Sequence, residues 1–134
     1  MSAGEIFYDT NIILYLLSGD SARADRAEEL LAAGGCVSVQ VLNEFAAVAS
    51  RKLGLSWKDV GEILTGVRAV CTVEPIVIET HERGLAIAAR YRLNVYDAMI
   101  VSSALLAGCK RLYSEDLQDG QIFEKQVTVR NPFR

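Results

Sequence analysis

The sequence predicts an α/β fold in which a parallel sheet of five short strands lies between two layers of helices. Runs rich in branched and aromatic residues alternate along the chain with longer segments whose apolar residues recur at helical spacing. Strands separated by helices pair in parallel, and such a sheet is covered on both faces. Hydrophobic residues make up 51% of the 134 residues, which is enough for one sizeable core.

The predicted strands are short and end at polar or turn-forming residues. The first is aromatic and branched, as buried strands are. Pro75 indicates either the end of the third strand or an edge position for it, because proline cannot donate to a sheet. The five predicted strands are Ile6–Tyr8, Cys36–Val39, Thr72–Ile76, Lys110–Ser114 and Gln126–Arg130.

The segments between the strands carry helix signals at their ends. Gly54 ends the helix over Val41–Leu53, and Ser56-Trp57-Lys58-Asp59 has the spacing of a capping box for the next helix. Thr80 is a candidate cap for the helix that follows the third strand. The segment after Asp97 is apolar on nearly every side, which is typical of a buried helix. One helix is expected directly after Asp9, and the others span Ala22–Ala33, Val41–Leu53, Ser56–Val70, His81–Arg92 and Asp97–Ala107.

Composition narrows the class of protein. We expect one domain over residues 1–134, because no repeat or linker interrupts the chain. A net charge of −3 argues against a broad basic face for a nucleic-acid duplex, although it allows a nucleic-acid enzyme whose acids are offset by metal ions. The start lacks a signal-peptide pattern, and the longest apolar run, Ile12–Leu17, is too short to span a bilayer.

The three cysteines, Cys36, Cys71 and Cys109, lie in or beside apolar runs and have no metal-type spacing. We expect buried, reduced thiols and a cytoplasmic protein.

Four of the 17 acidic residues occupy positions where a ligand could bind. Asp9 directly follows the first strand and Asp116 follows the fourth, so both are expected at the carboxyl edge of the sheet. Asp97 begins the apolar helix, where the helix dipole favours a carboxylate. Glu44 lies on the border of an apolar helix face and could point at the sheet edge or at solvent.

A simpler interpretation stays open for each of these acids. Asp9 and Asp97 could serve only as helix caps. Glu44 and Asp116 could be ordinary solvated carboxylates, one on a helix and one in an acidic loop.

If the four acids lie close together, a cation would be needed to offset their charges. Clustered carboxylates repel each other, and hard oxygen ligands suit Mg²⁺ or Mn²⁺. One or two such ions can activate a water and neutralise a phosphodiester in its transition state. The chain offers little else for chemistry, since His81 is its only histidine and no phosphate-binding glycine loop follows the first strand.

These motifs resemble a known family. The chain is similar over its whole length to PIN-domain ribonucleases of the VapC type, the toxins of toxin–antitoxin pairs. The resemblance is carried by Tyr8-Asp9-Thr10-Asn11, Asn43-Glu44-Phe45, Tyr96-Asp97-Ala98-Met99-Ile100, the segment 112–120 and the ending 127–133.

The resemblance implies a three-layer α/β/α fold with a five-stranded parallel sheet and an acidic pocket for Mg²⁺, which Mn²⁺ could replace. By that pattern, Asp9 and Asp97 are the principal metal ligands. Glu44 and Asp116 complete the catalytic site, directly or through metal-bound water.

Three further residues match supporting positions of the same family. Asn11 and Ser114 would orient the carboxylates. Ser114 stands where many members carry threonine, a departure that keeps the hydroxyl group. Asp119 is a candidate further acid.

The function implied by the resemblance is that of a metal-dependent endoribonuclease, partnered by an antitoxin and forming a homodimer. A haloacid-dehalogenase-like phosphatase would need a second aspartate where Asn11 stands. A receiver domain would need an aspartate after the third strand, which Glu74-Pro75-Ile76 does not supply. A module that binds RNA or a partner protein without cleavage remains the alternative from another class.

Overall fold

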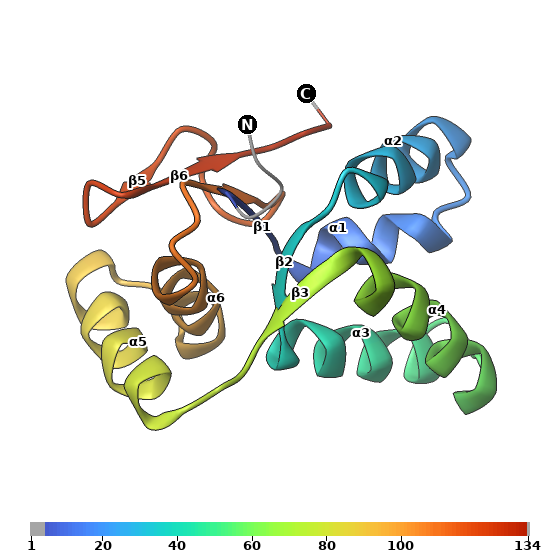
Figure 1. Ribbon diagram of the computed structural model, residues 1–134, viewed down its shortest axis with the longest axis horizontal. Coiled ribbons are helices and arrows are strands. Elements are labelled where there is room, and N and C mark those ends of the chain that lie inside the picture. Colours follow the sequence, from blue (N-terminus) through green and yellow to red (C-terminus); the bar gives the residue numbers. More distant parts are fainter. Residues whose placement is uncertain (1–4, 134) are drawn as a thin grey trace.

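The computed structural model describes residues 5–133, in which a mostly parallel sheet is flanked by helices (Figure 1). The strands are β1 Ile6–Tyr8, β2 Gly35–Ser38, β3 Cys71–Glu74, β4 Arg111–Tyr113, β5 Ile122–Phe123 and β6 Val127–Arg130. The helices are α1 Thr10–Leu14, the 3₁₀ turn η2 Tyr15–Leu17, α2 Ser21–Ala32, α3 Val39–Arg51, α4 Trp57–Val70, α5 Ile78–Tyr91 and α6 Val95–Leu106.

The strands lie in the order β3-β2-β1-β4-β6-β5, and all pairs are parallel except β5 with β6. The predicted three-layer arrangement and its five parallel strands are confirmed, but the sheet has a sixth strand. The sequence did not reveal β5 because it has only two residues. Its turn into β6 also lacks the usual glycine or asparagine, since Glu124 and Lys125 adopt positive φ instead.

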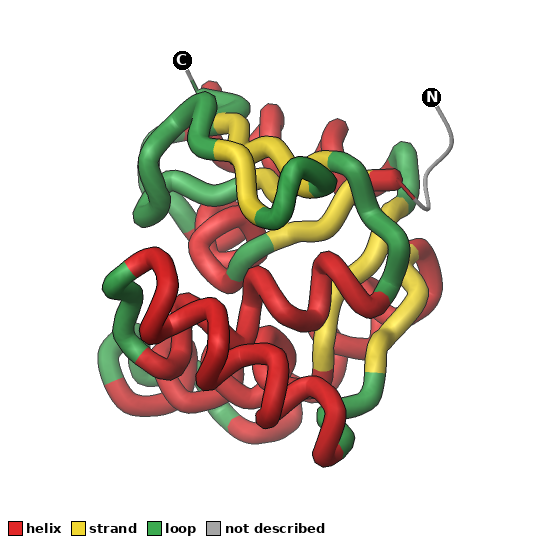
Figure 2. Tube along the Cα trace, turned by 90° about the vertical axis from the view of Figure 1, so that its left-hand side faces the viewer, coloured by secondary structure: helices red, strands yellow, loops and turns green. Residues whose placement is uncertain are grey.

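Helices cover both faces of the sheet. α1 to α4 lie on one side, and α5 and α6 lie on the other (Figure 1). Figure 2 shows α5 and α6 packed along each other, and α6 contacts β2, β4 and β6. The apolar character of α6 on every side follows from this position, because the sheet buries one of its sides and α5 another.

Three helices begin at least two residues earlier than the sequence predicts, and the first is α3, which begins at Val39 rather than at Val41. α5 begins at Ile78 rather than near His81, because the Thr80 hydroxyl accepts a hydrogen bond from the backbone of Val77 and caps the helix from inside its first turn. α6 begins at Val95 rather than at Asp97, because Asn94 is its N-cap. Asp97 therefore lies within the first turn of α6.

The order of the strands marks the boundary between β1 and β4 as special. The chain winds outward from β1 through β2 to β3, and then returns through α5 and α6 to β4 on the other side of β1. The winding therefore reverses between β1 and β4. Open α/β sheets bind ligands at the carboxyl ends of the strands at such a point.

Within residues 5–133, no helix combines the length and the apolar character needed to cross a membrane. The three cysteines are buried in the core and form no disulfide, as the sequence predicts.

Candidate metal-binding site

Asp9 stands at the carboxyl end of β1 and is buried, with 4% of its surface exposed. Its Oδ1 accepts a hydrogen bond from the backbone of Thr10 at 2.7 Å, which makes it the N-cap of α1. Its Oδ2 accepts a hydrogen bond from the Ser114 hydroxyl at 2.8 Å. Burial raises the pKa of Asp9 to about 6; the two hydrogen bonds lower it, and the charges of Asp116 and Asp97 raise it further.

Glu44 points at the sheet edge rather than at solvent. Its Oε2 accepts a hydrogen bond from the Thr10 hydroxyl at 2.7 Å, and its Oε1 accepts one from Gln40 at 2.8 Å. Thr10 therefore bonds to two of the predicted site residues, Asp9 through its backbone and Glu44 through its side chain.

Asp97 lies half-buried in the first turn of α6 and bonds reciprocally with the N-cap. Its backbone N–H donates to Asn94 Oδ1 at 2.9 Å, and Asn94 Nδ2 donates to Asp97 Oδ2 at 2.9 Å. Burial raises the pKa of Asp97, and the charges of Asp116 and Glu44 raise it further. The simple cap is thus Asn94, and the Asp97 carboxylate faces other acids.

Asp116 is the exposed member of the group. Its backbone N–H donates to the Ser114 hydroxyl at 3.2 Å, so Ser114 connects Asp9 to the loop after β4. Its charge acts on both Asp9 and Asp97. The end of β1, helix α3, the start of α6 and the loop after β4 therefore bring their four acids close enough for their charges to interact.

The remaining predicted residues lie around this group. Asn11 Oδ1 accepts a hydrogen bond from the backbone of Glu115 at 3.2 Å, while its buried Nδ2 has no partner within residues 5–133. Asp119 is exposed, and its Oδ1 accepts a hydrogen bond from the backbone of Asn131 at 3.0 Å. In this structure Asp119 therefore anchors the C-terminal segment.

The oxygen donors fit a hard divalent cation. Among the described residues, the ion pairs to lysine and arginine involve other acids, so none offsets the charge of Asp9, Glu44, Asp97 or Asp116. Within residues 5–133, no three acidic, histidine or cysteine side chains stand close enough to hold one ion together. As placed in this structure, the carboxylates do not form a complete metal site by themselves, so water would have to supply part of the coordination of an ion bound there.

A second network beside the acids could not be found from the sequence. The Tyr15 hydroxyl donates to the Glu115 carboxylate at 2.6 Å, and Arg23 Nη1 donates to Tyr15 at 2.8 Å and to Glu115 at 3.1 Å. The Tyr15 and Phe133 rings lie 4.3 Å apart between centroids. This network ties α2 and the C-terminal segment to the loop that carries Asp116, and its members have no common motif.

Thr10, Gln40 and Asn94 complete the hydrogen bonding of the acids, although the sequence did not indicate these contacts. Asn94 had a usable signal, because an asparagine three residues before an aspartate at a helix start has capping-box spacing. Gln40 and Thr10 had none beyond their closeness to Glu44 and Asp9 in the chain.

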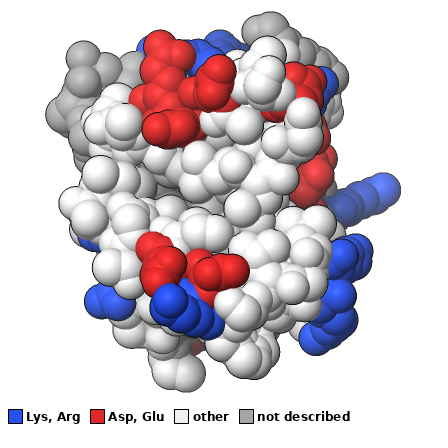
Figure 3. All heavy atoms as spheres, turned by 90° about the vertical axis from the view of Figure 1, so that its right-hand side faces the viewer, with Lys and Arg blue, Asp and Glu red and all other residues white. Residues whose placement is uncertain are grey.

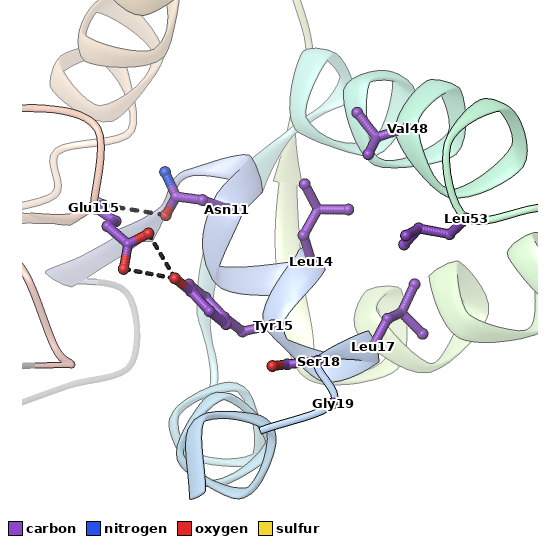
Figure 4. Close-up of a pocket in the computed structure, with 9 residues that line it drawn as sticks. All are labelled: Asn11, Leu14, Tyr15, Leu17, Ser18, Gly19, Val48, Leu53 and Glu115. Carbon is purple, nitrogen blue, oxygen red and sulfur yellow. Dashed lines mark hydrogen bonds between the residues drawn. The ribbon is translucent and has the colours of Figure 1, made fainter. Parts of the chain in front are cut away.

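A hollow of about 430 Å³ lies beside Asn11 and Glu115, whose near neighbours in the chain are Asp9 and Asp116 (Figure 4). Asn11, Tyr15 and Glu115 line its polar end. Apolar side chains line the rest, and these are Leu14, Leu17, Val48 and Leu53.

Comparison with known proteins identifies the family. Residues 6–119 match the PIN domain, and the chain therefore belongs to the PIN domain family. No curated protein sequence matches the chain significantly.

Several solved structures share the fold, including two that match most of this chain. One is the Mycobacterium tuberculosis VapC20, described as a Sarcin-Ricin loop cleaving toxin, with 22% identity and a TM-score of 0.64 over 83% of this chain and 89% of that chain. The other is a toxin–antitoxin complex from Klebsiella pneumoniae, with 22% identity and a TM-score of 0.71 over 95% of this chain and 97% of that chain.

Proposed function

We propose that this PIN domain is an endoribonuclease dependent on Mg²⁺, or on Mn²⁺ in its place, and the toxin of a toxin–antitoxin pair. The main support is the position of Asp9, a buried carboxylate at the reversal point of the sheet. It faces further acids and has no lysine or arginine as ion-pair partner within residues 5–133. The family and the fold shared with a Sarcin-Ricin loop cleaving toxin agree with this proposal.

In this proposal Asp9 and Asp97 hold the metal, and Glu44 and Asp116 complete its ligands directly or through water. The ion, when bound, supplies an activated water and offsets charge on the phosphodiester. The chain supplies orientation, because Ser114 fixes Asp9, Thr10 fixes Glu44 and Asn94 fixes Asp97. Fixed carboxylates need little reorganisation to receive the cation.

RNA cleavage by the purified protein tests the proposal. Excess chelator should abolish cleavage, Mg²⁺ or Mn²⁺ should restore it, and Asp9→Asn should be inactive under all conditions. Induced expression of the natural chain should arrest growth, whereas Asp9→Asn should not. Metal-independent cleavage would contradict the metal role, and RNA binding without cleavage would favour the binding-module alternative.

The antitoxin is proposed to deliver a basic, partly apolar segment across the acidic edge. Figure 3 shows the face over α2 and α4, where an uncharged, hollowed band lies between charged residues at the top and at the bottom. The hollow beside Asn11 and Glu115 has leucines next to one acid, Glu115, which also pairs with Arg23. Arginine pairs with carboxylates bidentately, so its guanidinium suits the acidic end.

A pull-down with the product of the neighbouring gene tests this partner. Leu17→Asp should weaken the complex by charging the apolar end, while Arg68→Gln, on α4, should not. Undiminished binding by Leu17→Asp would show that the partner docks elsewhere.

A homodimer is also proposed. Large apolar side chains are exposed where β3 leads into α5 and where α6 begins. They include Val77, Ile78 and Val95, with Ile78 at 72% exposure. A second copy covering them would remove this surface from water. Ile78→Asp should shift sedimentation toward the monomer, and a natural chain that stays monomeric at high concentration would rule the dimer out.

The buried, reduced thiols support a cytoplasmic location, which is part of the same proposal.

A further inference from the structure

Trp57, the only tryptophan of the chain, is exposed over 72% of its surface at the start of α4. Tryptophan is normally highly buried on average, so an isolated exposed ring suggests a contact with another molecule. The ring lines a hollow of about 560 Å³ between α3 and the start of α4, which pack against each other (Figure 1).

This hollow continues toward the acids along α3. Asn43 and Ala47 line it, and the same two residues line a second hollow of about 470 Å³ that includes Glu44. A groove therefore runs along one side of α3 from a proposed catalytic acid to Trp57.

A positive charge lies at the Trp57 end of the groove. Arg51 lines the same hollow, is exposed, and forms no ion pair within residues 5–133. Seven residues separate it from Glu44, which places both on one face of α3 about 10 Å apart along the axis. The carboxylates repel the phosphates of an RNA strand. A cation such as Arg51, at the other end of the groove, would help to hold the strand in place.

We propose that this groove binds an unpaired stretch of the RNA substrate, with a base stacked on Trp57 and a phosphate on Arg51. The inference rests on the proposed nuclease function and names the substrate form, an unpaired strand, because only an unstacked base can reach the ring. The exposed aromatic ring beside a cation favours RNA over a protein segment, and Asn43, Ser50 and Ser56 add polar atoms to a lining that also contains Ala46, Ala47 and Leu55.

The single tryptophan permits a direct test that does not depend on cleavage. An unstructured oligoribonucleotide of mixed sequence is titrated into full-length Asp9→Asn protein while tryptophan emission is recorded. Stacking should quench the emission saturably, and an equal amount of the same sequence as a fully paired duplex should quench it much less.

Variants then separate stacking from general attraction. Binding to these variants is measured with a dye-labelled oligoribonucleotide. Trp57→Ala should weaken binding by about fivefold or more, and Trp57→Phe should retain most of the affinity. Arg51→Gln should lower the slope of log affinity against log salt by about 0.7, the value for one lost phosphate contact on a single strand. The matched control Arg68→Gln removes the same charge from the other end of α4 and should leave affinity nearly unchanged.

Each outcome decides the inference. Quenching with the predicted ranking supports the groove, even if the natural chain fails to cleave RNA, in which case only the nuclease proposal falls. Cleavage without quenching, or equal losses in Arg51→Gln and Arg68→Gln, overturns the groove. A concentration-dependent change in emission without RNA, which a second copy covering Trp57 would cause, also overturns it.

Discussion

Asp9 uses both of its carboxylate oxygens in hydrogen bonds and still faces other acids. Each carboxylate oxygen accepts more than one hydrogen bond or metal contact, so the bonds from Thr10 and Ser114 leave lone pairs for a cation. The helix-cap interpretation of Asp9 and the metal-ligand proposal are therefore compatible. A substitution that keeps the shape and removes the charge distinguishes them.

Asp9→Asn should stabilise the metal-free protein at neutral pH. The folded pKa, about 6, lies above the ordinary value of 3.8, so Asp9 favours folding at low pH and loses that contribution as pH rises through 6. At neutral pH the buried charge costs on the order of 2–3 kcal/mol, which asparagine avoids. The free energy of unfolding of both proteins is measured by chemical denaturation in chelator, once at neutral pH and once at a pH below the ordinary carboxyl pKa. Asp9→Asn should be the more stable protein only at neutral pH. An equal gain in stability at both pH values would contradict the raised pKa of Asp9.

Ser114 joins two site residues through one buried hydroxyl, which donates to Asp9 and accepts from the backbone of Asp116 and of Leu117. Ser114→Ala should cost about 1–3 kcal/mol of stability, because buried groups lose their partners. Metal affinity should fall as well, since Asp9 loses its orientation. Ser114→Thr keeps the hydroxyl and should retain most of the metal affinity, which is measured by calorimetry. Equal losses of metal affinity in both variants would show that Ser114 contributes only to packing.

At the scale of the element, the first turn of α6 determines where Asp97 points. Asn94→Ala removes the N-cap and the side-chain bond to Asp97, at a cost of about 1 kcal/mol in stability. Cleavage should fall by more than this loss of stability explains. Asp20→Ala, which removes the N-cap of α2, is the control and should lower stability with activity retained. Equal activity in the two variants would show that Asn94 does not position Asp97.

The contact of β1 with β2 depends on a glycine. Gly35 has φ +147°, and a Cβ there would lie 2.4 Å from the Tyr8 ring and 2.9 Å from the backbone oxygen of Ile6. Tyr8 cannot move away easily, because it is fully buried and its hydroxyl lies 2.6 Å from the Gly34 carbonyl.

Gly35→Ala should therefore destabilise the protein by about 2 kcal/mol or more in chemical denaturation, through strain and the shift of β1. Gly61→Ala, in the interior of α4 with open space around it, should instead stabilise by about 0.5–1 kcal/mol. A tolerated Gly35→Ala would mean that β1 can move without affecting the fold.

At the scale of the whole molecule, the cation and the fold should stabilise each other. Four acids from both halves of the chain repel each other where the winding of the sheet reverses. A ligand that binds only the folded state raises stability by mass action, so Mg²⁺ or Mn²⁺ should raise the melting temperature.

Asp9→Asn and Asp97→Asn should lose most of this metal response. Glu62→Gln, which changes a distant acid on α4, should keep it. Thermal melts with and without metal measure the effect, and an undiminished response in Asp9→Asn would exclude it as a ligand.

Local pattern determined most of the fold. Apolar periodicity and caps predicted the five parallel strands and the helices, because each signal lies within a few residues of the element it defines. The order of polar residues also predicted Asp9 and Asp116 at one sheet edge, since strand ends in a parallel sheet share an edge.

Only the tertiary structure decided the rest, because the deciding contacts join distant parts of the chain. The direction of Glu44 depends on Thr10, 34 residues earlier. The network of Tyr15, Arg23 and Glu115 closes across 100 residues, and β5 exists because β6 offers it an edge. Periodicity places a side chain on a face of its own element, but the neighbour that faces it is set by how the elements pack.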